Sequence, residues 1–203
     1  MRDQAPATFA AAHARLFEHL CTSTPHRPDD LDGLQPLYQA VVHGVLAERE
    51  QETCDEVYFD RILRGTGKDG FYSWKKLGAI GPDLGAVAAF FEAPWHRVTT
   101  RLAEAHRASL LNEAALRLRS LGRLTEALEP MRAGLEMAVQ QEDWKNAAMY
   151  ASNLSQLELT PSWWSPDPRT RWRCATNYHR RLPELQDAEA AREAASAISR
   201  DRQ

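Results

Sequence analysis

Hydrophobic residues recur every three or four positions from Leu102 to Leu159, and polar turns interrupt them at intervals. This spacing places the apolar side chains on one face of a helix. It predicts helices over residues 102–121, 125–141 and 144–159. Gly122 follows the first helix, where a left-handed cap is favoured, and Pro130 is expected in about the first turn of the second, where proline is tolerated. The pattern therefore predicts paired helices that stack on one another.

Less regular spacing predicts helices earlier in the chain, separated by a loop rich in Pro and polar residues at 21–30. Thr53 with Glu56 three positions later is a capping-box pattern, and it is expected to begin the third helix. Pro82 suits the first turn of the last helix. Helices joined by short polar turns form αα-hairpins. The predicted helices span 7–22, 34–48, 52–64, 71–77 and 82–92.

The region from about residue 105 to 160 resembles the tetratricopeptide (TPR) family, in which small and large residues alternate at helix contacts. Ala127 and Gly134 take the small positions of the second helix, and Met131 the large position between them. The triplet that starts at Asn112 begins again at Asn153. This distance exceeds the usual repeat of about 34 residues, so the region is similar to the long-helix variety seen in kinesin light chains and bacterial signalling proteins. Asn112-Glu113-Ala114, Leu118, Gly122 and Asn153-Leu154-Ser155 complete the pattern.

The resemblance implies an all-α fold of TPR-like helical hairpins, stacked as a short right-handed α-solenoid with an irregular C-terminal tail. The first helix of each TPR pair lines a concave groove that binds a protein or peptide. The amides of Asn112 and Asn153 suit an extended peptide, because an amide both donates and accepts hydrogen bonds. The alternative is that these positions only pack or face water. The predicted groove residues are Ser109, Asn112, Leu116, Arg119, Tyr150, Asn153 and Leu157.

The segments FYSWKKLGA, GRLTEALEPMRAGLEMAV and DWKNAAMYASNLSQLEL also resemble the C-terminal TPR region of bacterial multidomain signalling and NTPase proteins. This resemblance implies a first alternative function, the ligand-sensing region of a larger bacterial signalling or defence NTPase. No NTPase motif is present here: Lys68 is followed by Asp69, and the glycine spacing is not that of a P-loop.

The tail departs from the repeat pattern, because Pro161, Pro166 and Pro168 are incompatible with a regular helix. We hypothesise that it is the frameshifted end of a longer array. Arginines interspersed with Trp163, Trp164 and other aromatic residues give a second alternative function, nucleic-acid binding, although a disordered or aberrant tail is favoured over it. The predicted organisation is an N-terminal helix and loop (1–30), irregular hairpins (31–100), a TPR-like region (101–160) and a tail (161–203) with a helix-forming stretch at 183–200.

The composition narrows the range of functions and cellular locations to consider. Among the 203 residues, 26% are charged and the formal net charge is −3, so nothing draws the whole chain to nucleic acid or anionic lipid. Three separated cysteines give no disulfide framework. With no apolar run long enough for a membrane span and no convincing secretory signal, a cytoplasmic protein is expected.

The sequence contains no catalytic motif. Its seven histidines form no HExxH and join no cysteine at metal-ligand spacing, and no GxSxG occurs. We therefore expect no enzyme activity, cofactor or metal. The aromatics of 71–95 are expected in a core rather than a ligand pocket. The predicted function is a non-catalytic protein–protein interaction or scaffolding module of TPR type, which self-associates through an uncapped stacking face.

Overall fold

Helices account for most of the chain, as the hydrophobic spacing predicts. The computed structural model describes residues 6–65 and 70–163, with the side chains from Ala7 to Glu158. Two compact units, residues 1–103 and 104–203, are described separately below. The predicted segments 1–30 and 31–100 both fall in the first unit, and most of the predicted tail lies outside the described residues. Within the described part, no helix is both long and apolar enough to cross a bilayer.

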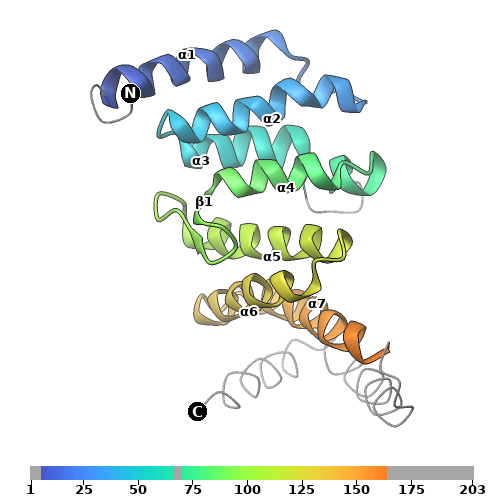
Figure 1. Ribbon diagram of the computed structural model, residues 1–203. Coiled ribbons are helices and arrows are strands. Elements are labelled where there is room, and N and C mark those ends of the chain that lie inside the picture. The colour runs from blue at the N-terminus through green and yellow to red at the C-terminus, as the bar shows by residue number, and fades with distance from the viewer. Residues whose placement is uncertain (1–5, 66–69, 164–203) are drawn as a thin grey trace. The chain divides into compact units, whose positions relative to one another are not determined.

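In the first unit, α2 is the central helix, and α1, η1 and α4 all pack against it (Figure 1). Asp30 caps the start of α2 by accepting a hydrogen bond of 2.7 Å from the backbone N–H of Gly33. The apolar face of α2 is fully buried at Leu34, Leu37 and Val41. The elements of this unit are α1 (Pro6–Ser23), α2 (Leu31–Leu46), α3 (Glu50–Glu52), η1 (Thr53–Ile62), η2 (Tyr72–Lys76), α4 (Ile80–Ala89), β1 (Phe91–Ala93) and β2 (Arg97–Val98).

The third predicted helix exists, but most of it is a π-helix. The one-turn α3 continues directly into η1, where hydrogen bonds such as that from the Leu63 N–H to the Tyr58 carbonyl (2.9 Å) span five residues. The predicted capping box is wrong, because the helix begins at Glu50 and Thr53 lies inside it. The Thr53 hydroxyl donates to the Arg49 carbonyl (2.7 Å), so this residue does not cap free N–H groups.

A small β-hairpin follows α4 and corrects the all-α prediction to a mostly helical fold. The predicted helix over 82–92 starts at Ile80, with Pro82 in its first turn as expected, and ends at Ala89. The antiparallel β1 and β2 then pair Phe91 with Val98. Trp95, with a φ of 66°, takes the left-handed conformation between the two strands and reverses the chain.

In the second unit, the helices predicted from the hydrophobic spacing are confirmed as α5 (Glu104–Ser120), α6 (Leu124–Gln140) and α7 (Trp144–Trp163). Gly122 adopts the expected left-handed conformation between α5 and α6, with a φ of +75°. The placement of Pro130 in the first turn of α6 is wrong, since it lies in the helix interior and is buried. Proline there cannot donate the backbone hydrogen bond to Glu126 and crowds its carbonyl, and burial against neighbouring helices offsets this cost.

Small residues allow α5 and α6 to approach closely, as the repeat pattern predicts. A Cβ atom on Gly134 would lie 3.1 Å from the Ala108 carbonyl oxygen and 3.4 Å from the Asn112 nitrogen. Ala127, the other small position, is fully buried. Because the nearest atoms are backbone atoms of α5, the separation of these helices depends on the missing side chain.

In the first unit, a glycine likewise allows α2 to lie close to its neighbours α1 and η1. A Cβ on Gly44 of α2 would lie 2.0 Å from the Thr53 hydroxyl and 2.8 Å from Cδ2 of Phe17. Phe17 comes from α1 and Thr53 from η1, so three helices meet at this position. Both neighbours are themselves buried, which leaves them little freedom to move.

We expect the substitution Gly44→Ala to lower the free energy of unfolding by about 1–3 kcal/mol, because the added methyl overfills this contact. Gly85→Ala is the matched control: nothing lies within 4 Å of a Cβ at this exposed position of α4. There, alanine should raise stability by up to ~1 kcal/mol through its helix propensity. Urea unfolding of both variants measures the difference, and equal stability of the two would contradict the packing described here.

Candidate functional site

The predicted groove residues lie on α5 and α7, and several of them bind one another. The Tyr150 hydroxyl donates to Oγ of Ser109 at 3.3 Å, and the Asn153 amide donates to Oδ1 of Asn112 at 3.1 Å. Both pairs join residues 41 positions apart. We call these two pairs the α5–α7 ladder. Its constant spacing shows that α5 and α7 lie side by side in one register.

Burial divides the predicted groove residues into two groups. Asn112 and Tyr150 are 2% exposed and Leu157 is 1% exposed, so their side chains contact neighbouring helices. Burial also raises the pKa of the Tyr150 hydroxyl to about 12, which keeps it protonated. The accessible members of the predicted groove are the half-buried Ser109, Leu116, Arg119 and Asn153. Arg119 also donates to Oε1 of Gln156 on α7 at 3.3 Å.

An ion pair that the sequence analysis missed lies at the centre of the second unit. Arg117 is fully buried and donates to the carboxylate of Glu113, one turn earlier on α5, which is 3% exposed. The i, i+4 spacing of Glu and Arg is visible in the sequence. It is also the usual spacing of exposed pairs, so the sequence alone gave no sign of burial.

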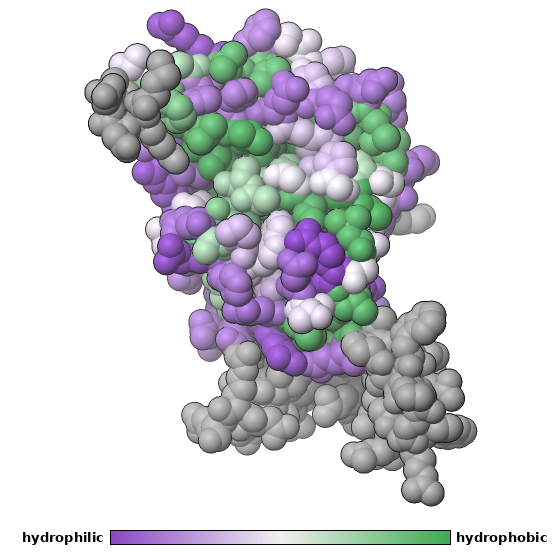
Figure 2. Space-filling view, viewed as in Figure 1, coloured by the Kyte–Doolittle hydropathy of each residue, from purple (hydrophilic) through white to green (hydrophobic). Residues whose placement is uncertain are grey.

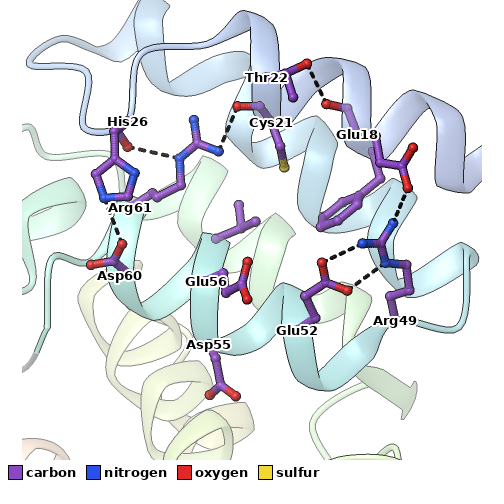
Figure 3. Close-up of a pocket in the computed structure, with 12 residues that line it drawn as sticks. Glu18, Cys21, Thr22, His26, Arg49, Glu52, Asp55, Glu56, Asp60 and Arg61 are labelled. Atoms are coloured by element: carbon purple, nitrogen blue, oxygen red, sulfur yellow. Dashed lines mark hydrogen bonds and ion pairs between the residues drawn. The ribbon is translucent and has the colours of Figure 1, made fainter.

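The first unit contains a cavity of about 520 Å³ between α1 and η1 (Figure 3). Phe17 and Val57 form its apolar part. Arg49 lies between two of its carboxylates, 2.9 Å from Glu18 and 2.5 Å from Glu52. The other charged residues around it are Asp55, Glu56, Asp60, His26 and Arg61.

Arg61 of η1 holds the loop between α1 and α2. Its guanidinium donates to the backbone carbonyls of Cys21 (3.1 Å), Thr24 (3.0 Å), Pro25 (3.1 Å) and His26 (3.0 Å). Because Arg61 is only 7% exposed, these bonds replace the water that the charge gives up. Sequence reasoning missed this role, because the four acceptors are backbone atoms and carry no residue signature.

A second set of contacts fastens the same loop to η1. His26 lies 2.9 Å from Asp60, and Arg27 also pairs with this carboxylate. Burial would raise the pKa of Asp60, but Arg27 and His26 together hold it below its ordinary value. The cations around the cavity are thus engaged with the loop or with carboxylates of the cavity wall.

The chemistry available in this cavity is limited. Among the described residues, no three His, Cys, Asp or Glu side chains converge as metal ligands would. Burial raises the pKa of the Cys21 thiol, partly offset by the nearby charge of Arg61, and a protonated thiol is a weak nucleophile. The contacts around Arg49 and Arg61 are therefore best described as the structural fastening of α1.

Comparison with known proteins gives no assignment. No model of a protein family matches the chain, and neither a curated protein nor a solved structure is significantly similar to it. The arginine- and tryptophan-rich tail, on which the nucleic-acid alternative depends, lies outside the described residues apart from the backbone of its first positions.

We expect Arg61→Met to lower the free energy of unfolding by about 3 kcal/mol, because it leaves buried carbonyls without donors. Arg27→Met removes a guanidinium from the same loop and is the matched control. The Arg27 side chain is 47% exposed, and exposed ion pairs contribute only about 0–1 kcal/mol. Chemical denaturation of the two variants provides the measurement. Similar losses in both would refute the role assigned to Arg61.

Arg117→Met should cost about 3–5 kcal/mol, because it leaves the Glu113 carboxylate buried without its partner. The double substitution Glu113→Leu with Arg117→Met removes both charges and should recover most of that loss. A double-mutant cycle by urea unfolding tests this expectation. The cycle also needs the single variant Glu113→Leu. A loss in the double variant equal to the sum of the two single losses would show that the charges are not coupled.

Proposed function

We propose that this chain is a non-catalytic binding or scaffolding module built from TPR-like helical repeats, and that its partner is a protein or peptide. The observation that carries the proposal is the α5–α7 ladder, in which residues 41 positions apart pair between α5 and α7. In a TPR-like array these two would be successive first helices. A constant register between first helices is what a stacked repeat array requires. The close approach at Gly134 supports the same reading, since small residues at that contact belong to the repeat pattern.

The proposed binding surface lies along α5 and α7 and comprises the half-buried Ser109, Leu116, Arg119 and Asn153. An apolar side chain, a guanidinium and an amide on neighbouring positions suit a peptide with both apolar and acidic groups. Asn112 contributes indirectly in this proposal, because its side-chain oxygen accepts from Asn153 and orients that amide. The ladder thus supplies a rigid base on which the accessible residues are held.

A peptide selection on the full chain tests the proposed surface. Peptides selected for binding should lose at least about tenfold in affinity against Arg119→Glu, since like charges at an interface are repulsive. Arg132→Glu is the matched charge reversal: Arg132 lies on α6 and is half-buried to a similar extent. It pairs with Glu158 rather than with the ladder. Binding to this control should be retained.

Circular dichroism and thermal unfolding of both variants establish that each is folded before binding is compared. Peptides that bind Arg119→Glu as well as the unmodified chain would exclude the proposed surface. Failure to select any peptide would count against a peptide-binding module as a whole.

A further inference from the structure

Two histidines of the first unit face each other across the contact between α1 and α2. Nδ1 of His13 lies 2.8 Å from Nδ1 of His43. The two rings are stacked, with centroids 4.9 Å apart and an interplanar angle of 23°. Phe9, one turn earlier on α1, contacts the His13 ring edge-on at 4.3 Å. Neither histidine belongs to the site described above.

The Nδ1–Nδ1 contact depends on how many protons the pair carries. In the neutral pair, one ring donates from Nδ1 and the other accepts at its Nδ1. A first added proton is held on the Nε2 of the donor ring and leaves the hydrogen bond intact with a charged donor. A second added proton must occupy the accepting Nδ1. Two N–H groups then face each other on two positive rings, and the contact becomes repulsive.

The other charged groups around these helices have partners of their own or are exposed. Glu48 and Glu50, which line a cavity beneath the start of α1, both pair with Arg101, and Asp32 is exposed. Between Asp32 and Glu48, the titratable residues are Tyr38 and His43. The Tyr38 hydroxyl donates a hydrogen bond to Asp83 of α4. On α1, Glu18 pairs with Arg49, while Arg15 and His19 are exposed. On α3, Glu50 pairs with Arg101, Glu52 with Arg49, and Gln51 with Asp55 of η1. On η1, Asp60 pairs with Arg27 and His26, and Arg61 binds the loop. Glu56 lines the cavity described above.

The two ends of α1 are held by different means. Near its C-terminus, Phe17 packs against Gly44, Glu18 pairs with Arg49, and the Cys21 carbonyl accepts from Arg61. Toward the N-terminus, the His13–His43 contact is the cross-helix hydrogen bond. The first turn of α1, Pro6 to Phe9, holds no acidic side chain to offset the helix dipole. The N-terminal half is therefore the end that depends on the histidines.

Beneath this half of α1 lies a second cavity, of about 500 Å³. Phe9 and Ala10 of α1 form one wall, and Val45 and Leu46 of α2 continue it. Hydrophobic surface is visible on this part of the first unit in Figure 2, below α1 and near the start of β1 in Figure 1. The remaining apolar residues of the wall are Ala89, Phe90 and Phe91. The opposite side of the cavity is polar and is lined by Glu48, Glu50, Glu92, Thr99 and Arg101.

We propose that His13 and His43 form a pH-sensitive latch that holds the first two turns of α1 on α2, and that protonation of both rings releases this end and uncovers the apolar wall of this cavity. The release needs no change at the Arg61 end, because a guanidinium keeps its charge throughout the accessible pH range. Residues 6–13 then lift while residues 17–23 stay in place.

The pH range follows from the chemistry of His43. Burial, together with the charge of His13, lowers the pKa of His43 below its ordinary value of 6.5. A group whose pKa is lower in the folded chain contributes stability that is present above the unfolded pKa. This stability is lost as pH falls through the folded value. The latch is therefore closed at pH 7.5 and opens at a pH below 6.5.

Hydrogen–deuterium exchange of the full chain at pH 7.5 and pH 5.0, corrected for intrinsic exchange rates, tests the latch. We expect the protection of residues 6–13 to fall several-fold at the lower pH, while residues 17–23 change little. His43→Gln should abolish this pH response, because an amide does not titrate. His19→Gln, a matched substitution at an exposed position of α1, should retain it.

Two further measurements keep the test decisive. If His43→Gln does not fold, His13→Gln replaces it, with the same expected loss of response. Binding of the neutral dye Nile red should increase at pH 5.0 in the unmodified chain, and should be high at both pH values in Phe9→Ala, which removes part of the cavity wall. Unchanged protection of residues 6–13 at pH 5.0 would overturn the proposal. So would a full pH response in the variant lacking one of the paired histidines.

Discussion

The buried guanidinium of Arg61 sets the constraint on which the first unit depends. A buried charge must replace its lost hydration with hydrogen bonds. Arg61 does so with the carbonyls of Cys21, Thr24, Pro25 and His26. Cys21 lies in the last turn of α1 and the other three acceptors lie in the loop that follows. Because all four are backbone atoms, the arginine determines the path of the backbone and constrains the side chains there very little. The end of α1 is thereby fastened to η1, and the contact of Phe17 with Gly44 aligns it on α2.

Polar groups in the second unit also need hydrogen-bond partners, and they find them within one helix or between two helices. Arg117 is neutralised by Glu113 on its own helix, while Asn112 pairs with Asn153 on α7. An interface of leucines and alanines tolerates sliding by one helical turn, whereas a partly buried amide pair is satisfied in one register only. The polar pairs therefore specify the alignment of α5 and α7, and the apolar residues around them supply most of the stabilisation.

Periodicity along the chain predicted the helices well, because burial of one helix face leaves a local pattern that is read directly from the sequence. It placed Thr53 wrongly, since tertiary contacts decide where a helix begins. For Pro130 the start of the helix was predicted to within one residue, but the proline lies in the helix interior, where packing overrides its low helix propensity. The π-helical geometry of η1 and the β1–β2 hairpin left no comparable pattern. In the predicted groove, the spacing of Asn112 and Asn153 was evident from the sequence. Their mutual hydrogen bond was not, because periodicity identifies a helix face without identifying what it contacts. The roles of Arg61 and His43 depend on partners about 30 to 40 positions away, beyond the reach of any local rule.

Arg61 and the His13–His43 pair hold the two ends of α1, and they differ in whether acid changes their protonation. The guanidinium of Arg61 does not lose its proton in proteins, so its bonds to the loop persist over the whole range in which histidine titrates. The contact between His13 and His43 requires one Nδ1 atom without a proton. If both ends of α1 rested on histidines, acid would detach the whole helix and expose Phe17 as well. With an arginine at one end and a histidine pair at the other, protonation acts on the end that covers the cavity beneath Phe9. The contacts of Arg61 thus hold one end of α1 at any pH in this range, whereas the histidine contact at the other end depends on pH.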